Sequence, residues 1–226
     1  MIRADLHIHS LVSDGMAHPY DIVRYARKVG LNVISITDHN TFLGSIIASK
    51  LGIRDVTVIY GNEVRTEFGD LLLLCEYYPK DASMDLTELV DLARNYNCLL
   101  IPAHPLAILR KGMGYYVIKH YMHLWDGIEI FNGASDPLTN AITYKLFKDL
   151  RKAKIANSDA HILDAIGTTY TIVKSRSKRV EDVLEAIRRN LTIPMYNLNS
   201  ISLRIQVLRI AWSIERFLRR IRHQCL

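Results

Sequence analysis

The sequence predicts an α/β fold in which a mainly parallel sheet closes, or nearly closes, into a barrel. Short apolar runs of β type alternate with amphipathic stretches of helical period along most of the 226 residues. About seven such strand–helix units fit into one domain, which favours a barrel over an open sheet. The length suits one well-buried α/β domain better than two.

The expected elements follow one another with short connections. Strands are predicted from apolar runs at residues 4–8, 32–37, 56–62, 70–75, 99–103, 127–131, 154–157 and 169–173. Helices are predicted between them at residues 20–29, 41–50, 85–96, 115–120, 136–151 and 180–189. Asp136 followed by Pro137 is typical of a helix start, and Gly30 and Gly52 lie where glycines end helices.

The segment from residue 195 to 226 differs from the rest in charge. Six arginines face a single acid there, Glu215, whereas residues 1–194 hold 23 basic and 22 acidic side chains. Its apolar residues share one helical face, which comprises Leu203, Val207, Ile210, Ile214, Phe217, Leu218 and Ile221. We therefore expect a barrel at residues 1–194 and a basic amphipathic helix at 195–226 that packs on it, with a solvated basic face. A nucleic-acid arm or a membrane-surface helix is the alternative.

Composition limits the class of protein. Hydrophobic residues make up 49% and charged residues 23%, which is typical of a globular protein. No apolar run reaches the roughly 18 residues that a membrane-spanning helix needs, and no secretory signal is visible, so we expect a cytoplasmic protein. Cys75, Cys98 and Cys225 predict neither a disulfide framework nor a thiolate zinc site, and Cys75 and Cys98 are expected to be small core residues.

Residue types that bind metals follow nearly every predicted strand. They are, in chain order, His7, His9, Asp14, Asp38, His39, Glu63, His104, Asn132, Asp159 and His161. Because the carboxyl ends of parallel strands meet at one mouth of a barrel, we expect these side chains to lie close together. Imidazoles mixed with carboxylates suit zinc, manganese or iron.

Alternation along the first strand explains the spacing of its histidines. Asp5, His7 and His9 share one side of the strand, so His7 and His9 can bind one metal. Asp5, one step deeper, is expected to orient a histidine by a hydrogen bond. Asp38 is expected either to orient His39 or to cap the following helix. Asn132 is either a site residue or a turn residue.

Six motifs, DLHIHS, SDG, TDHN, GNEV, AHP and SDAH, occur in this order at the predicted strand ends. They resemble the motifs of the PHP (polymerase and histidinol phosphatase) superfamily over most of the chain. The resemblance implies a distorted, TIM-like (β/α)7 barrel with two or three divalent metal ions at its mouth. It also implies a metal-dependent phosphoesterase.

The resemblance further implies three sets of metal ligands. They are His7, His9, Glu63 and Asp159 for one metal, Glu63 and His104 for a second, and Asp14, His39 and His161 for a third. Many members have a histidine where this chain has Asp70. Asp70 either binds the second metal through its carboxylate or leaves that metal weakly held.

The expected reaction is hydrolysis of a phosphate ester of a small metabolite or nucleotide, by attack of a metal-bound hydroxide. Proton transfer would be assisted by one or more of Asp14, His39 and His161. Substrate-binding side chains are expected near the mouth at Arg65, Arg110, Lys111 and Asn132. Two alternatives remain: a nuclease acting on single-stranded nucleic-acid ends, and a non-catalytic RNA-binding protein of the ribonuclease P subunit type. The sequence leaves the oligomeric state open.

Overall fold

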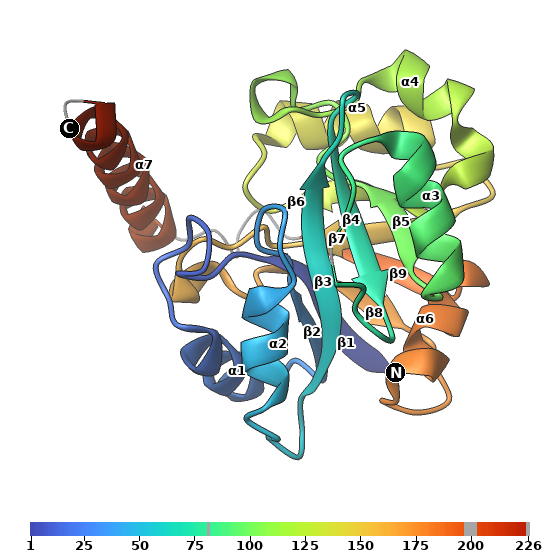
Figure 1. Ribbon diagram of the computed structural model, residues 1–226, viewed down its shortest axis with the longest axis horizontal. Coiled ribbons are helices and arrows are strands. Elements are labelled where there is room, and N and C mark those ends of the chain that lie inside the picture. The colour runs from blue at the N-terminus through green and yellow to red at the C-terminus, as the bar shows by residue number, and fades with distance from the viewer. Residues whose placement is uncertain (81, 197–202, 225–226) are drawn as a thin grey trace.

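The computed structural model describes residues 1–80, 82–196 and 203–224, and it shows an α/β fold built around a curled sheet (Figure 1). All eight predicted strands form, with ends that shift by a few residues, and one further strand follows them. Their bounds are Ile2–Ile8 (β1), Val33–Ile36 (β2), Thr57–Arg65 (β3), Asp70–Cys75 (β4), Leu99–Pro102 (β5), Gly127–Asn132 (β6), Ala153–Asn157 (β7), Thr169–Val173 (β8) and Thr192–Tyr196 (β9).

The sheet is mixed, and the prediction of a mainly parallel sheet was wrong. Seven strands pair in the order β5-β4-β3-β2-β1-β8-β9, and β4 runs antiparallel to both of its neighbours. β8 is likewise antiparallel to β1 and to β9. The turn between β3 and β4 covers only residues 66–69, which is too short for the crossover that a parallel pair requires.

A second, two-stranded sheet stands beside the first. β6 and β7 pair in parallel, and they lie next to β5 on one side and to β8 and β9 on the other. The strand ladders of the described residues therefore form a half-barrel with a separate parallel pair, and they do not show a closed (β/α)7 barrel.

Helices cover the outside of the sheet, close to where the sequence predicts them. Their bounds are Pro19–Lys28 (α1), Leu43–Ser49 (α2), Leu86–Asn95 (α3), Tyr115–His120 (α4), Pro137–Phe147 (α5), Val180–Arg188 (α6) and Leu203–Gln224 (α7). The predicted start at Asp136 is confirmed, because its side chain accepts a hydrogen bond from the Thr139 amide at 2.9 Å. Gly30 ends α1 with a φ of 76°, in the left-handed region that favours glycine.

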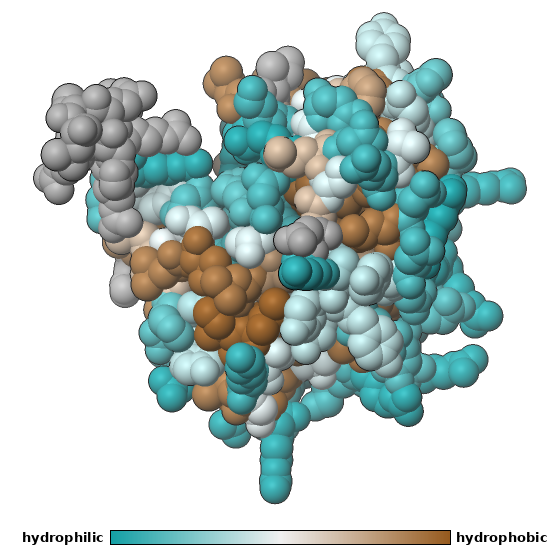
Figure 2. All heavy atoms as spheres, viewed as in Figure 1, coloured by the Kyte–Doolittle hydropathy of each residue, from teal (hydrophilic) through white to brown (hydrophobic). Residues whose placement is uncertain are grey.

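The core lies on both faces of the sheet. In β4, Leu72 and Leu74 pack into the cluster that includes α6, whereas Leu71 and Leu73 pack into the cluster that includes α3. Because both faces are covered, the strand is an uninterrupted apolar run rather than an alternating one. The outer surface mixes polar and apolar side chains, and apolar ones gather over α2, where Leu43 is exposed (Figure 2).

The two core cysteines form a disulfide, contrary to the prediction of separate small core residues. Cys75 ends β4 and Cys98 immediately precedes β5, and the register pairs Leu74 with Leu99. The antiparallel pairing therefore places Cys75 and Cys98 opposite each other, with 4.1 Å between their Cα atoms. The sequence did not indicate this pairing, because the direction of β4 was not known. Cys225 lies outside the described residues.

Helix α7 packs on the body with a different face from the one predicted. Ile205 is buried, and Leu208 and Trp212 pack against the same cluster of core residues. Val207, Ile210 and Ile214, predicted to lie on the packed face, are 55%, 60% and 55% exposed. The predicted face also included Leu203, Phe217, Leu218 and Ile221, whose side chains lie outside the described part of the structure. Among the described residues, no helix has both the length and the apolar character to cross a membrane.

Candidate metal centre

The ends of the strands bring all the predicted metal ligands together. Each of them belongs to a group of three or four residues whose ligand atoms lie within 4.8 Å of one another. The groups are His9, Asp14, His39 and His161; His7, His9 and Glu63; His7, His104 and Asp159; and Glu63, Asp70 and His104. Asp70 reaches this edge because β4 is antiparallel and so begins where the neighbouring strands end.

Glu63 is at the centre of the cluster and lies close to four imidazoles. Its Oε1 atom is 2.9 Å from His104 Nε2 and 3.4 Å from His7 Nε2. Its Oε2 atom is 3.2 Å from His9 Nε2 and 3.0 Å from His39 Nδ1. A buried carboxylate with one oxygen directed to each side can be shared by two cations.

Asp14 forms a second centre nearer the open side. Its Oδ1 atom is 3.3 Å from His161 Nε2 and 3.5 Å from His9 Nδ1, and its Oδ2 atom is 3.5 Å from His39 Nε2. Asp159 lies between the two centres, because its Oδ1 atom is 3.5 Å from His7 Nε2 and 3.4 Å from His9 Nε2.

Asp38 holds the loop that carries Asp14. Its carboxylate accepts hydrogen bonds from the Ser10 amide at 2.8 Å, the Ser10 hydroxyl at 2.6 Å and the Ser13 hydroxyl at 2.5 Å. The prediction that Asp38 orients His39 or caps the next helix with its side chain was therefore wrong. The loop after β1 curls back onto the end of β2, and Asp38 therefore binds this loop.

Asp5 has a different partner from the predicted histidine. Its two carboxylate oxygens accept hydrogen bonds from the amides of Ser158 at 3.0 Å and Gly167 at 2.9 Å. Burial raises the pKa of Asp5 to about 6, and these hydrogen bonds oppose the rise. Asp5 thus fixes the chain just before Asp159.

Glu129 in β6 orients His7, a role that was not predicted from the sequence. Its Oε1 atom lies 3.1 Å from His7 Nδ1 and its Oε2 atom accepts a 2.7 Å hydrogen bond from the His104 amide. A proton held on Nδ1 leaves Nε2 free to bind a metal. The signal was available, because Glu129 is an acid inside the apolar run GIEIF.

Two of the predicted substrate-binding arginines are paired with acids of the cluster. Arg65 binds Asp70 through two contacts of 3.0 and 3.2 Å, and Arg110 lies 2.6 Å from Asp159. Lys111 borders the same cavity. These side chains therefore place positive charge at the mouth.

Asn132 is both a site residue and a turn residue. Its amide group donates to Glu129 and to Asp159, each at 3.0 Å. Its side-chain oxygen accepts from the backbone amides of Ala134 and Ser135 and from Arg110 at 3.2 Å. Asn132 therefore links the turn after β6 to the acids and to Arg110.

The donors in the cluster fit divalent metal ions. Hydrogen bonds among the described residues leave His9 Nδ1, Glu63 Oε2, His104 Nδ1 and Asp159 Oδ1 buried without a partner of acceptable geometry. Buried polar atoms without partners are costly, and a metal would satisfy atoms of this kind. Nitrogen and oxygen donors in this mixture suit zinc, manganese or iron.

The acids at the centre of the cluster are held in the ionised form that binds metals. Burial would raise the pKa of Asp159, but Arg110 and the neighbouring histidines hold it well below its usual range. Burial would likewise raise the pKa of Glu63, but His7 and the other imidazoles hold it well below its usual range. Burial and the nearby His9 lower the pKa of His161 to about 4, so this imidazole is neutral at pH 7.

The backbone is in an unfavourable conformation at two of these residues. His104 has a φ of 29° and Asp159 a φ of 48°, both in the left-handed region. Non-glycine residues rarely adopt this region, and their presence there is common at functional sites. Each residue lies two positions after the last residue of a strand, in the turn at the strand end.

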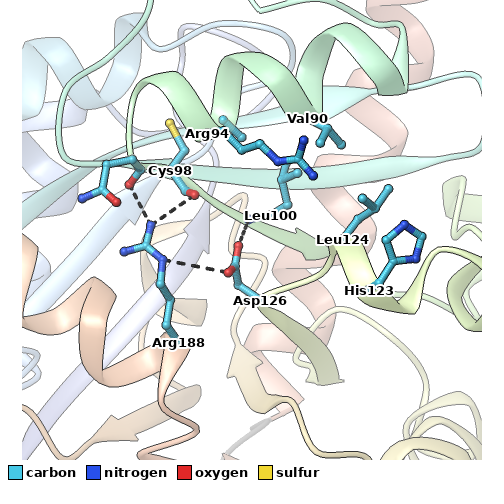
Figure 3. Close-up of a pocket in the computed structure, with 10 residues that line it drawn as sticks. Val90, Arg94, Cys98, Leu100, His123, Leu124, Asp126 and Arg188 are labelled. Carbon is cyan, nitrogen blue, oxygen red and sulfur yellow. Dashed lines mark hydrogen bonds and ion pairs between the residues drawn. The ribbon is translucent and has the colours of Figure 1, made fainter.

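A cavity of about 290 Å³ opens over the cluster, bordered by His39, Asp159, Arg110 and Arg216 among others. A slightly larger cavity, about 350 Å³, lies at the opposite end of β5 (Figure 3). There Arg188 donates to the carbonyl oxygens of Asn97 and Cys98 and lies 3.9 Å from Asp126 (Figure 3). These contacts tie α6 to the segment just before β5, and the described residues around this cavity form no cluster of metal-binding side chains, so we place the functional site at the smaller cavity.

Comparisons with known proteins found a family model and a similar sequence. A family model described as PHP-associated matches residues 137–192. The chain is 32% identical over 165 residues to an uncharacterized protein, MJ1587, of Methanocaldococcus jannaschii. The matched region covers 66% of this chain and 94% of that protein.

Two solved structures are similar in fold. One is a two-domain protein of Bacteroides vulgatus that contains a predicted PHP-like metal-dependent phosphoesterase, with a TM-score of 0.73, 18% identity and coverage of 87% of this chain and 65% of that chain. The other is the lesion-specific endonuclease EndoQ of Pyrococcus furiosus, with a TM-score of 0.62, 17% identity and coverage of 86% and 57%.

Proposed function

We propose that this chain, which belongs to the PHP (polymerase and histidinol phosphatase) superfamily, is a metal-dependent hydrolase that cleaves a phosphate ester of a small metabolite or nucleotide. One observation carries the proposal. Imidazoles and carboxylates from six strand ends meet around Glu63 and Asp14 as groups able to hold metal ions. The non-catalytic RNA-binding alternative does not need such a set.

The residues divide naturally into two or three ion sites. Glu63 would be shared between an ion held with His7, His9 and Asp159 and an ion held with His104, and the Asp14 group would hold the third. Divalent ions there would neutralise charge on the phosphate and activate a water molecule. Zinc, manganese and iron all fit the donors. Asp70 could join the second ion while it stays paired with Arg65, because each carboxylate oxygen has two lone pairs.

The remaining side chains of the mouth would bind the ester and handle its proton. Arg110 is fixed by Asp159 and Asn132, and it faces the cavity together with Lys111. We propose that they bind the oxygens of the phosphate. Asp14, His39 and His161 lie at the open side, and we propose that they either hold the third ion or transfer a proton. The cavity volume of about 290 Å³ favours a small ester.

Nuclease activity is the second candidate. It is supported by the similarity of this fold to EndoQ, an endonuclease, and by the positive side chains around the mouth. A strand of nucleic acid would need contacts beyond the cavity, and its binding would weaken steeply as salt concentration rises. Cleavage of a small ester would depend far less on salt.

The test is hydrolysis of phosphomonoesters, phosphodiesters and single-stranded oligonucleotides in the presence of manganese, zinc or iron. We expect a small ester to be cleaved, with little loss of rate between 50 and 200 mM salt, roughly the range over which backbone-binding proteins lose most of their affinity. The variants His9→Ala and Asp159→Asn should lose hydrolysis, whereas His120→Ala, an exposed residue of α4, should retain it. Near-normal rates in the first two variants, or a purified protein that binds none of the metals, would contradict the proposal.

A further inference from the structure

We propose that α7 forms one wall of the active-site cavity and that Arg216, on this helix, binds an anionic oxygen of the substrate. This inference rests on the function proposed above. It assigns a role to a helix that the sequence predicts only to pack on the barrel with a solvated basic face. In Figure 1, α7 stands at the edge of the molecule, beside the loop that follows β1.

The inward face of α7 is fixed against the body by apolar contacts. Ile205 is buried, and Leu208 and Trp212 pack against the cluster that includes Ile8 and Ile162. The spacing of three, then four, residues keeps these side chains on one face of the helix. The first part of α7 is therefore held as a packed helix beside the mouth.

Polar contacts then join α7 to the metal-binding residues themselves. Trp212 donates its indole N–H to the carbonyl oxygen of Asp14 at 2.7 Å, and its ring centroid is 4.3 Å from that of His161. Arg209 donates to the carbonyl oxygen of Gly133 at 2.7 Å, in the turn after β6. The helix thus contacts loops from three parts of the chain that carry or adjoin site residues.

Arg216 follows Trp212 by one helical turn and reaches into the cavity. Its guanidinium lies 2.8 Å from Asp14 Oδ2 and stands 5.3 Å from the centroid of the Trp212 ring. A guanidinium held over an aromatic face is already oriented before it binds an anion. Arg216 borders the same cavity as Arg110 and Asp159.

The arginines of this cavity differ in how many of their donors are already used. Arg65 makes two contacts with Asp70, and Arg110 contacts both Asp159 and Asn132. Among the described residues, Arg216 makes one ion pair, and its side chain is 34% exposed. A guanidinium carries five N–H donors, so Arg216 can bind Asp14 and a phosphate oxygen together.

A purely structural role for Arg216 predicts a different result. If the guanidinium acted only by orienting Asp14, its removal would lower the affinity of the Asp14 group for its metal ion and leave the affinity for the anion unchanged. Metal content and anion affinity must therefore be measured separately, on the full chain.

The experiment measures binding of inorganic phosphate to the metal-loaded protein by calorimetry, together with its metal content by elemental analysis. The variants are Arg216→Met, which removes the charge, and Arg216→Lys, which keeps it. The matched control is Arg54→Met, which removes one charge from an exposed position in the loop before β3. Steady-state hydrolysis provides KM and kcat for each variant once a substrate is found.

We expect Arg216→Met to weaken phosphate binding about ten- to a hundredfold, as the loss of a charged hydrogen-bonding group predicts. Metal content and the melting temperature should match the wild type, Arg216→Lys should recover part of the affinity, and Arg54→Met should bind phosphate normally. Unchanged phosphate affinity in Arg216→Met, or the loss of one equivalent of metal, would overturn the inference and leave the proposed hydrolase standing. A wild-type protein that binds metals but neither binds phosphate nor hydrolyses any ester would overturn both.

Discussion

Replacing Glu129 with glutamine tests how the cluster is held together. The carboxylate is buried and contacts four nitrogen atoms, His7 Nδ1, Asn157 Nδ2, Asn132 Nδ2 and the His104 amide, at 2.7 to 3.1 Å. Glutamine has nearly the same shape, but its side chain has one oxygen that accepts hydrogen bonds and one NH2 group that donates them. Its NH2 group must therefore face two of these nitrogens.

The surroundings decide which way the glutamine turns. The His104 amide can only donate, and Asn132 is fixed because its side-chain oxygen accepts from two backbone amides. The NH2 group should therefore face Asn157 and His7. Asn157 cannot invert, since its oxygen accepts from the Leu6 amide at 2.9 Å, but His7 can move its proton to Nε2.

Two effects follow from this arrangement. The hydrogen bond to Asn157 is lost, and the remaining hydrogen bonds no longer have a charged acceptor. Removing one buried charge offsets part of this loss, so the free energy of unfolding should fall by about 2–4 kcal/mol. That cost lowers the melting temperature by roughly 4–16 °C in a protein of this size. In addition, a proton on Nε2 of His7 blocks a metal-binding atom, so metal affinity should fall about ten- to a hundredfold.

Urea unfolding followed by tryptophan fluorescence, together with metal titration, measures both effects. The control is Glu185→Gln on α6, where the exposed carboxylate pairs with Arg189 at 2.8 Å. That surface pair should change stability by no more than about 0.5 kcal/mol and leave metal affinity unchanged. Wild-type stability and wild-type metal affinity in Glu129→Gln would refute the proposed role of this residue.

Two further predictions concern the metals and the disulfide. Removal of bound metal with a chelator should lower the melting temperature by roughly 5–10 °C, because ligand at a hundred times its Kd stabilises the folded state by about 2.7 kcal/mol. An equal melting temperature with and without manganese or zinc would contradict this. Reduction of Cys75–Cys98, which are 23 residues apart, should cost roughly 3 kcal/mol of unfolding free energy by the loop-entropy relation. The Cys98→Ala variant should show no response to reductant, and two titratable thiols in the native protein at these positions would argue against the bridge.

Much of the local structure could be predicted because it depends on neighbouring residues. Apolar runs predicted eight strands, and the Asp136-Pro137 pair predicted the start of α5. The strand β9 was missed because it contains Pro194, which cannot donate to a ladder. β9 lies at the edge of the sheet, where a proline is tolerated. The direction of β4 was also missed, since an apolar run has the same pattern in either direction.

The candidate site could be predicted only in part, for a similar reason. Most of the motifs lie at or just after the end of a strand, so the topology gathers most of the ligand residues, whereas Asp14 lies in the loop after β1. The partners of Asp5, Asp38 and Glu129 depend on segments that are far apart in the sequence, and Glu129 lies 122 residues from His7. The packed face of α7 was predicted wrongly because hydropathy gave no weight to the hydrogen bonds that Trp212 and Arg209 make at the mouth.

The left-handed backbone at His104 and Asp159 has a consequence for the evolution and engineering of this protein. Both residues have a disfavoured backbone conformation, and both belong to the buried cluster of ionisable side chains. Replacing either with glycine would relieve backbone strain, although at Asp159 it would also leave Arg110, 2.6 Å away, without its acidic partner. At His104 selection for heat resistance alone could therefore favour a glycine that removes a metal-binding side chain, so any stabilisation of this scaffold must be screened for metal binding at the same time.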